Sequence, residues 1–387
     1  MLKVRDEIQT MLTMIRENRR HLHMYPEIEL NTPQTKAYLI EQLKNIKSLV
    51  IEEGYAINGF VAYLKVNDKN SCVAFRSDMD ALPIQEENDW EYKSKYEGYS
   101  HACGHDGHMS ILLATIRYLA KHKEALSENV LFIFQPGEEE PGGASLMIKD
   151  GLFKKYPIRC IFGTHVNADL AAGLISCAGG PLMARNGEIS IDIYGQSAHG
   201  ALAYQGVDAM VAASAMVMQL QTIVSRSIDP LESTVLTLGM IQGGQARNVI
   251  CDHVNMEGTM RSFHDESYEL QKQRIQDIAK GIEQSFQVRV EACVNDYYQV
   301  VNNDVHLDEL LQKATKDSYV KQKPMMIAED FSFYQKEVPG LFYYTGVRDE
   351  EHTRGIHDCK FNFDETSLLN AVETNIRLLE IMEILHD

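Results

Sequence analysis

The fold of this chain is decided by Asn129-Val-Leu-Phe-Ile-Phe-Gln-Pro136, a short run of β-branched and aromatic residues that ends at a proline. Such a run predicts a buried strand. Further strands are predicted at 71–80 and 159–165, and helical patterns at 109–122 and 144–149 lie between the three. Strands that alternate with helices at this spacing predict an α/β domain, doubly wound around a central, mostly parallel sheet.

The pattern changes near Pro181, which indicates a second domain. A chain of 387 residues is long for one core. A strand-helix-strand-strand-helix-strand succession then predicts an inserted α+β domain over 184–296, and leaves 1–183 and 297–387 as a discontinuous catalytic domain. The predicted strands of the insertion are 187–195, 234–241, 253–261 and 287–293, and its helices are 208–225 and 266–286. The catalytic domain adds helices over 1–24, 35–49 and from 367, and a strand at 340–346.

Composition and charge restrict the partners. The net charge is −18, and the acidic residues are spread along the chain, which argues against nucleic acid and anionic membranes as partners. The seven cysteines have irregular spacing and do not form a disulfide framework, as expected in a reducing cytosol. The first residues lack the apolar core of a leader, and no later run is long enough to cross a bilayer. The sequence therefore predicts a soluble, cytoplasmic protein.

The densest chemistry is in His101-Ala-Cys-Gly-His-Asp-Gly-His108. Its histidines and Cys103 are ligand types for zinc-like and other first-row divalent ions, and its glycines allow the tight turns that bring close neighbours to one point. The loop therefore predicts a metal site. Two alternatives stay open here. The loop could be a structural zinc knuckle, although no second Cys or His pair follows at regular spacing, or Cys103 could be a nucleophile with a nearby histidine as its base.

Other candidate ligands follow the predicted strands. In open α/β sheets ligands bind beyond the carboxyl ends of the strands. Asp78 and Asp80 follow one strand, Glu138 and Glu139 another, and His165 a third. Adjacent side chains point in different directions, so one glutamate can bind metal while its neighbour faces the reacting water. His357 is a later candidate, in Gly355-Ile-His-Asp-Cys-Lys-Phe361.

A series of motifs, in order over nearly the whole chain, resembles that of the co-catalytic metallopeptidases, which include aminoacylases and carboxypeptidase-G-like enzymes. The most similar branch is the amidohydrolase branch of hippurate hydrolases, auxin-conjugate hydrolases and N-acetyl-diaminopimelate deacetylases. The motifs are Arg20-His-Leu-His23, Arg76-Ser-Asp-Met-Asp-Ala-Leu-Pro83, Cys103-Gly-His-Asp-Gly-His108, Phe134-Gln-Pro-Gly-Glu-Glu139, Gly163-Thr-His165, Gly195-Gln-Ser-Ala-His199, Gly243-Gly-Gln-Ala-Arg-Asn-Val-Ile250, Glu329-Asp-Phe331 and His357-Asp-Cys-Lys-Phe361.

The resemblance implies a role for each matching residue. Glu138 would be the general base and acid, and His199, on an inserted lid or dimerisation domain, would reach the substrate carbonyl. Asp80 and Asp106 would stand behind the ligands, Asp80 fixing an imidazole, and Asn248 would bind substrate. The ligands of two divalent ions would be Cys103, His105, Glu139, His165 and His357.

The resemblance also implies the reaction: hydrolysis of the amide bond of an N-acyl amino acid or small peptide, with a hydroxide held between two ions. The thiolate favours zinc-like ions by its softness, whereas the resemblance points to manganese, which we expect; zinc, cobalt and nickel are the alternatives. A homodimer or homotetramer is expected. The chain departs from the branch at positions where proline is frequent, and this leaves the acyl group and the amino acid open. These positions are Ala168, Ala203-Tyr204, Cys251 and Cys359.

Two other classes of function are weighed against this one. A thiol amidohydrolase would use Cys103 as its nucleophile and would survive a chelator but not a thiol-alkylating agent. A catalytically silent relative would only bind peptide or metal. The intact Glu138-Glu139 pair argues against the silent relative, because a binding protein needs no free base beside a metal.

Overall fold

The computed structural model describes residues 2–68 and 71–386. Met1 and Asp387, the ends of the predicted catalytic domain, lie outside the described residues. The chain divides into two compact units, and the first comprises Met1–Leu182, Asn302–Lys323 and Glu329–Asp387. The second comprises Met183–Val301 and the short segment Pro324–Ala328. This segment joins the second unit because the Ala184 N–H donates to the carbonyl of Ile327 (3.0 Å).

A mixed eight-stranded sheet organises the first unit, in the order β1-β2-β4-β3-β5-β14-β6-β13. The central strands β4, β3, β5 and β14 are mutually parallel, which confirms the predicted α/β class. β3 and β4 are buried along their whole length, as their apolar sequences predict. The strands are β1 (Leu49–Tyr55), β2 (Gly59–Leu64), β3 (Cys72–Asp78), β4 (Asn129–Gln135), β5 (Ile158–Ala171), β6 (Ile175–Cys177), β13 (Tyr319–Lys321) and β14 (Gly340–Arg348).

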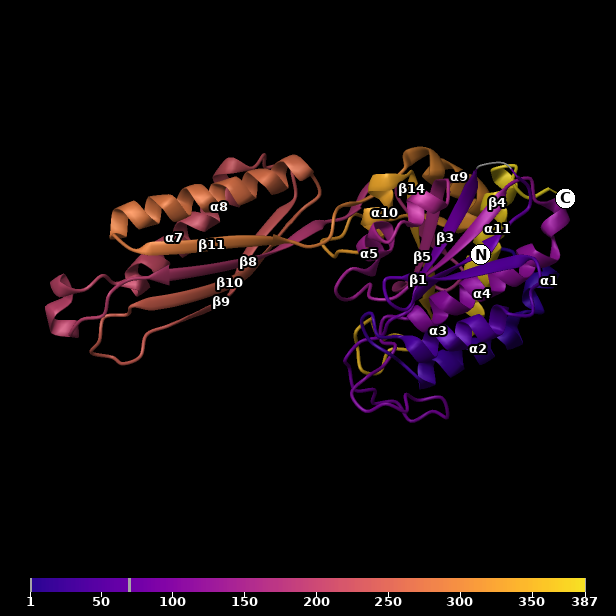
Figure 1. Ribbon diagram of the computed structural model, residues 1–387, viewed down its shortest axis with the longest axis horizontal. Coiled ribbons are helices and arrows are strands. Elements are labelled where there is room, and N and C mark those ends of the chain that lie inside the picture. The colour runs from indigo at the N-terminus through magenta and orange to yellow at the C-terminus, as the bar shows by residue number, and fades with distance from the viewer. Residues whose placement is uncertain (1, 69–70, 387) are drawn as a thin grey trace. The chain divides into compact units, whose positions relative to one another are not determined.

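Helices cover both faces of this sheet. One layer contains α2 (Leu12–Met24), α3 (Pro33–Leu43), α4 (His105–Lys121), α9 (Val305–Thr315) and α11 (Leu368–Ile381), which pack against one another. The other contains α5 (Gly143–Lys149), α6 (Leu152–Lys155) and α10 (Phe331–Glu337). Figure 1 shows α2, α3 and α4 along one side of the strands and α5 and α10 on the other. Among the described residues, no helix is both long and apolar enough to cross a membrane.

The sequence prediction was wrong at the start of the chain. The predicted helix over 1–24 is divided into α1 (Asp6–Gln9) and α2. The predicted helix over 35–49 ends at Leu43, and Leu49 begins β1, which pairs antiparallel with β2. Ala56 and Ile57 form the connecting turn with positive φ values of 43° and 66°. Pairing with β2 therefore outweighs the helical spacing of the apolar residues before it.

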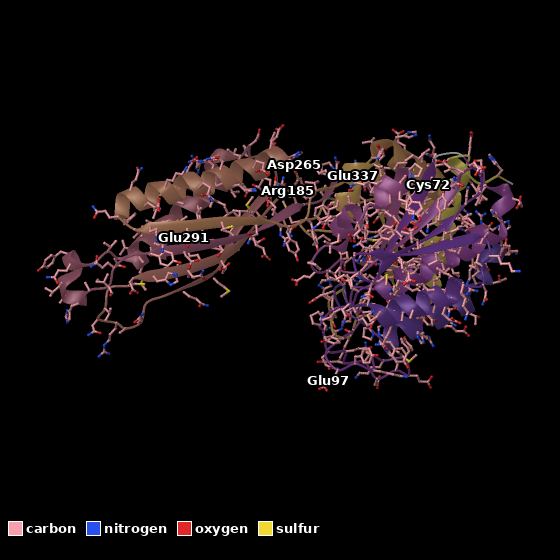
Figure 2. The ribbon with its side chains drawn as sticks, in the orientation of Figure 1. Cys72, Glu97, Arg185, Asp265, Glu291 and Glu337 are labelled. Carbon is pink, nitrogen blue, oxygen red and sulfur yellow. The ribbon has the colours of Figure 1, made fainter. Side chains whose placement is uncertain are left out.

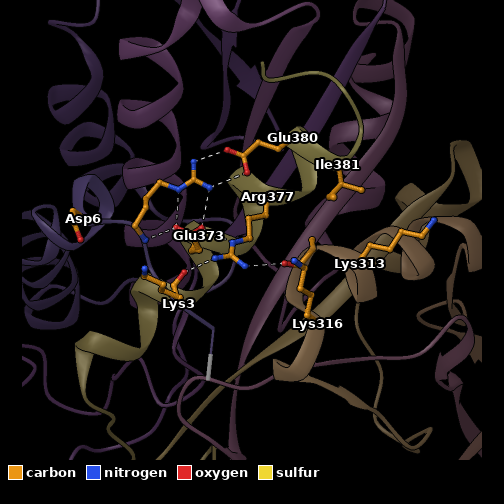
Figure 3. Close-up of a pocket in the computed structure, with 10 residues that line it drawn as sticks. Lys3, Asp6, Lys313, Lys316, Glu373, Arg377, Glu380 and Ile381 are labelled. Atoms are coloured by element: carbon orange, nitrogen blue, oxygen red, sulfur yellow. Dashed lines mark hydrogen bonds and ion pairs between the residues drawn. The ribbon is translucent and has the colours of Figure 1, made fainter. Parts of the chain in front are cut away.

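An ion-pair network attaches the N-terminal segment to α11 (Figure 3). Arg5 donates to Glu373 (3.0 Å) and Glu380 (2.7 Å), and Arg377 donates to the same Glu373 (2.6 Å). Glu373 is almost completely buried, so removing its cations would leave an uncompensated charge. An open pocket of about 630 Å³ lies over this network. Because Glu373 and Glu380 are already paired with arginines, we interpret the pocket as part of a structural joint.

The second unit is a four-stranded antiparallel sheet in the order β11-β8-β10-β9. Helices α7 (Ala209–Thr222) and α8 (Asp265–Phe286) pack against each other and against the sheet. The start of α8 is tied to β8 by an ion pair between Arg185 and Asp265 (3.0 Å; Figure 2). The predicted strand-helix-strand-strand-helix-strand succession is confirmed. Its strands are β8 (Arg185–Tyr194), β9 (Thr234–Gly243), β10 (His253–Ser262) and β11 (Arg289–Asp296), and β7 (Gly180–Met183) pairs with β12 (Val301–Asn303) in a separate two-stranded sheet.

Candidate metal centre

The carboxyl ends of three parallel strands bring the predicted site residues together. β3 ends at Asp78, with Asp80 just beyond it, and β4 ends at Gln135, before Glu138 and Glu139. His165 lies within β5 and not at its end, because this strand continues to Ala171. Since β3, β4 and β5 run parallel, these side chains converge at one edge of the sheet.

A left-handed glycine shapes the metal loop. Gly104 has a φ of 89°, and a Cβ placed on it would lie 2.5 Å from Cγ2 of Val166, so no other residue fits there. Helix α4 begins directly after it, at His105. The sequence predicted this start at residue 109, because the apolar pattern begins there. The earlier start places His105, Asp106 and His108 in the first turn of the helix.

Two histidines have a free lone pair directed into the site. Nδ1 of His105 is 2.8 Å from the carbonyl oxygen of Asp80, and Nδ1 of His165 is 2.7 Å from that of Val166. A carbonyl only accepts, so each Nδ1 carries the hydrogen and each Nε2 keeps its lone pair. Nε2 of His105 is buried and has no hydrogen-bond partner in the part of the chain that the structure describes. Nε2 of His165 lies 3.3 Å from Sγ of Cys103.

The predicted ligands form two triads that share Cys103. The ligand atoms of Cys103, His105 and His165 lie within 4.8 Å of one another, and so do those of Cys103, Glu139 and His357. The backbone of His357 is fixed by a hydrogen bond from its N–H to the carbonyl of Ala102 (2.7 Å). A thiolate, imidazoles and a carboxylate, with a buried lone pair among them, fit divalent first-row ions. The shared sulfur fits a pair of such ions.

The thiol of Cys103 is not prepared to act as a free nucleophile. Burial, together with the carboxylates of Glu139 and Glu138, raises the pKa of this thiol well above its usual value. A thiol of this kind is protonated at neutral pH unless a cation lies beside it, and reactive cysteines have a lowered pKa. This environment favours metal binding over the nucleophile alternative.

Glu138 lies beside the triads, and an oxygen of its carboxylate is within 4.8 Å of ligand atoms of His105 and Glu139. Its carboxylate is 4.0 Å from Nε2 of His105 and is 6% exposed. Burial and the nearby carboxylate of Glu329 raise the pKa of Glu138 well above its usual value. A raised pKa brings a carboxyl group closer to the range in which general bases and acids operate.

Comparison with known proteins agrees with this geometry. The sequence profile of peptidase family M20/M25/M40 matches residues 74–381. The chain belongs to this family. It is 36% identical over 366 residues to an N-acetyldiaminopimelate deacetylase of Listeria monocytogenes (94% of this chain, 97% of the relative). It is 37% identical over 354 residues to the enzyme of that name from Exiguobacterium sibiricum (91% and 95%).

Two solved structures match over nearly the whole chain. A protein from methicillin-resistant Staphylococcus aureus superposes with a TM-score of 0.92 and 31% identity, covering 97% of this chain and 98% of that one. A Bacillus subtilis protein described as a dinuclear metal-binding peptidase of the M20 family gives a TM-score of 0.84 and 28% identity, with 97% and 99% covered. The predicted family resemblance is confirmed, and the chain is a metal-dependent amide hydrolase.

Two histidines of the metal loop of this M20 chain lie outside the triads. Nδ1 of His108 bonds to Asp78 (2.7 Å), and its Nε2 accepts the N–H of Val166 (2.9 Å), so neither nitrogen is available to a metal. Burial lowers the pKa of His101 to about 3, which keeps this ring neutral. The ring of His101 lies 6.5 Å from that of His23, away from the ligand atoms. Spacing in the loop does not separate these rings from His105, whereas the family resemblance implied only His105 as a ligand.

The carboxylate of Asp80 has a role that the sequence did not predict. It was expected to fix an imidazole, but it lies 3.8 Å from Nδ1 of His105, which the backbone carbonyl of Asp80 binds instead. The carboxylate accepts the N–H groups of Glu138 (2.9 Å) and Glu139 (3.0 Å). Asp80 therefore holds the turn that carries both glutamates.

An arginine that the sequence analysis gave no role balances the acidic cluster beside Glu138. Arg76 is buried and bonds to Asp78 (2.7 Å), Asp330 (2.7 Å) and Glu329 (3.0 Å). Its charge compensates these carboxylates, so we do not interpret them as another metal site. Arg76 and Glu329 both lie in quoted motifs, and the available signal was their charge in apolar surroundings.

Asp106 is held by hydrogen bonds to residues that are not predicted ligands, as expected for a residue that supports the ligands. It accepts from Arg19 (3.0 Å), from Nδ1 of His23 (2.7 Å) and from the N–H of Gly107 (2.8 Å). Burial alone would raise the pKa of Asp106, but Arg19 and His23 outweigh it and lower this pKa. Asp106 is therefore ionised and does not face the triads as a ligand.

His199 and Asn248 lie together in the second unit. The N–H of Gly200 donates to the carbonyl of Asn248 (2.7 Å), and His199 pairs with Val249 in a β-bridge. Both His199 and Asn248 are exposed. Nδ1 of His199 accepts the N–H of Ala201 (3.1 Å), so the hydrogen is on Nε2, which is a donor directed away from that contact.

Replacing a ligand should remove metal. We expect Cys103→Ala and His165→Ala to cut the metal content and abolish activity, because each change opens the coordination shell. The measurement is metal stoichiometry by mass spectrometry of purified protein, with Cys160→Ala and His122→Ala as matched controls outside the triads. Two ions per chain and full turnover in both ligand variants would show that the ligand assignment is wrong.

Proposed function

We propose that this chain removes the acyl group from an N-acyl amino acid, with N-acetyldiaminopimelate as the first candidate substrate. The observation that carries the proposal is Glu138, a buried carboxylate with a raised pKa, beside two triads that share one thiolate. The names of the most similar relatives support the choice of substrate. Two divalent ions, whose charge a thiolate and a carboxylate offset only in part, would leave the site positive and suit a substrate that retains a free carboxylate.

In this proposal two divalent ions bind to the triads. Cys103, His105 and His165 would hold one ion, and Cys103, Glu139 and His357 the other. When bound, such ions polarise the amide and lower the pKa of water. Manganese is our proposed metal; zinc, cobalt and nickel are the alternatives that the thiolate and imidazole set also accommodates.

Glu138 moves the proton. Its carboxylate takes a proton from the attacking water and then gives it to the leaving amine, so that one residue serves as base and acid. The clamp of Asp80 on the N–H groups of Glu138 and Glu139 supports this division. The Asp80 carboxylate fixes the two backbone N–H groups, which would allow one side chain to bind metal while the other transfers the proton.

His199 stabilises the charge that develops on the amide oxygen. The observation that supports this role is the hydrogen on Nε2, which follows from the contact between Nδ1 and Ala201. A donor of this type strengthens its hydrogen bond as the oxygen becomes negative. Asn248, next to it in the same unit, would bind substrate. The inserted unit would then act as a lid as well as a dimerisation domain.

We also propose a homodimer formed through the second unit, in the cytoplasm. β9 lies at the edge of its sheet, where backbone groups can pair with another chain. Exposed apolar side chains on β9 and α7 support an interface at this edge. They are Met210, Val211, Met218, Met240 and Ile241. The free state of the seven cysteines supports a reducing compartment.

A substrate panel tests the proposed function. The metal-loaded protein would be assayed with N-acetyldiaminopimelate, other N-acetyl amino acids, hippurate and dipeptides, and released amine would be quantified. The highest kcat/KM should belong to N-acetyldiaminopimelate. A preference for dipeptides would contradict the deacylase proposal, and activity that survives a chelator but not thiol alkylation would contradict the metal mechanism.

The proposed roles of Glu138 and Glu139 predict different effects of the same Glu→Gln substitution at the two positions. Glu138→Gln keeps the shape but removes the base, so metal should stay bound while kcat falls by ~10²–10⁴, the usual contribution of general acid-base catalysis. Glu139→Gln should instead weaken metal binding. Metal content and turnover, measured on the same preparations, separate the two. The reverse pattern would exchange the roles of Glu138 and Glu139.

The oxyanion role of His199 predicts a turnover defect. His199→Ala should lower kcat by ~10²–10³, with bound metal unchanged and the Michaelis constant little affected. His253→Ala is the matched control, since His253 is an exposed histidine of the same unit that pairs with Asp192. Wild-type turnover in His199→Ala would reduce His199 to a structural residue.

The dimer proposal predicts dissociation on adding charge to the edge. The double variant Met218→Glu, Ile241→Glu should sediment as a monomer in analytical ultracentrifugation, because buried unpaired carboxylates disfavour association. Ile57→Glu, at an exposed apolar residue of the first unit, should leave the oligomeric state unchanged. A wild-type monomer, or a double variant that remains dimeric, would contradict this interface.

A further inference from the structure

The motif Arg20-His-Leu-His23 has no role in the proposed chemistry, yet helix α2, which carries it, packs against α4 behind the metal loop. Two side chains of α2 are almost fully buried there: Arg19 is 1% exposed and His23 is 2% exposed. Burying a guanidinium is costly unless it is paired and hydrogen-bonded. The partners of Arg19 and His23 therefore indicate what these residues do.

Both side chains converge on one carboxylate oxygen. Nε of Arg19 and Nδ1 of His23 lie 3.0 and 2.7 Å from Oδ2 of Asp106. Asp106 adjoins the ligand His105 in the first turn of α4, and its Oδ1 accepts the N–H of Gly107. The contacts therefore fix the start of the helix that presents His105.

His23 also reaches the loop that precedes the metal ligands. Its Nε2 is 3.4 Å from Oε1 of Glu86. Glu86 in turn accepts from Nε1 of Trp90 (2.9 Å) and the N–H of Ser94 (2.7 Å). The loop from Glu86 to Ser94 contains no helix or strand, so these contacts and the link to His23 organise it.

Arg19 reaches the segment that follows the late ligand His357. Its Nη2 donates to Oδ1 of Asn362 (2.6 Å), and the amide of Asn362 donates to Tyr92 (3.0 Å). The N–H of Glu87 donates to the carbonyl of Cys359 (2.9 Å), which joins the same two segments. Arg19 and His23 thus tie together the segments around His105 and His357, which belong to different triads.

We propose that Arg19 and His23 are positioning residues for the metal centre. They hold Asp106, Glu86 and Asn362 so that the ligand loops keep the spacing that two ions require. This inference rests on the proposed function, because it needs the triads to bind metal. Residues that orient metal ligands typically contribute about 10- to 100-fold to metal affinity without contacting the ion.

The test compares two histidines of the same helix. His23→Gln should raise the dissociation constant for Mn²⁺ or Zn²⁺ by about 10- to 100-fold. The constant would be measured by competition with a chromogenic chelator. His21→Gln is the matched control: His21 stacks on Tyr38 (ring centroids 3.9 Å apart) and, among the residues described, forms no hydrogen bond with Asp106. The metal affinity of this variant should therefore equal that of the wild type.

A second substitution separates positioning from loss of stability. His23→Asn can keep a donor where Nδ1 meets Asp106, whereas His23→Gln places its donor nearer to Glu86. We expect His23→Asn to recover most of the metal affinity. Thermal unfolding of the metal-free variants supplies the independent readout, and the affinities should not follow the unfolding temperatures. Equal losses in Asn and Gln variants, in step with their metal-free stability, would overturn the inference.

The outcome also distinguishes this inference from the proposed function. If the wild type binds two ions, Cys103→Ala loses them and His23→Gln binds like the wild type, only the positioning role fails. If the wild type binds no ions, the proposed metal centre fails, and the inference fails with it.

Discussion

Charge compensation beneath the carboxyl ends of β3, β4 and β5 is the constraint on which the site depends. Buried carboxylates at this edge need cations, since an unpaired buried charge is costly. Arg76 pairs with Asp78, Glu329 and Asp330, and Arg19 and His23 pair with Asp106. Cys103 and Glu139 have no comparable arginine among the described residues. Two divalent ions would supply the missing charge.

The hydrogen-bond partners of the two ring nitrogens indicate which histidines can bind metal. A ring whose two nitrogens are occupied, as in His108, is part of the protein's own hydrogen-bond network. A ring with Nδ1 fixed by a backbone carbonyl, as in His105 and His165, presents a prepared lone pair. Spacing in the loop therefore predicts a set of candidates, and only the three-dimensional partners select the ligands.

Much of the fold could be predicted because its signals are local. Burial is indicated directly by the sequence in three strands: β3 and β4 are apolar runs, and β8 alternates between buried and more exposed residues. The β1–β2 hairpin could not be found in this way, because β1 is half exposed and depends on pairing with β2. The start of α4 at His105 was missed because polar ligands fill its first turn where an apolar face was expected.

The site was predictable where chemistry is concentrated, and not where it depends on long-range contacts. The predicted ligands are reactive residue types in short motifs: Cys103 stands out in the sequence by itself, whereas the ligand roles of Glu139 and His357 came from the family resemblance. Arg19 and Asp106 are 87 positions apart, and no local pattern links them. The functions of Arg76 and of the Asp80 carboxylate likewise appear only when the strands are side by side.

The turn after β4 shows how one constraint creates a division of labour. Asp80 accepts the N–H groups of two successive residues, Glu138 and Glu139, so the backbone there is fixed twice by one carboxylate. Successive side chains on such a backbone leave it in different directions, although the ligand atoms of Glu138, Glu139 and His105 still lie within 4.8 Å of one another. Glu139 therefore turns toward His357, and Glu138 toward His105 and the acidic pocket of Glu329. The proposed difference between a ligand at Glu139 and a proton carrier at Glu138 would then follow from backbone geometry, and the surrounding charges would adjust each carboxyl group to its proposed role.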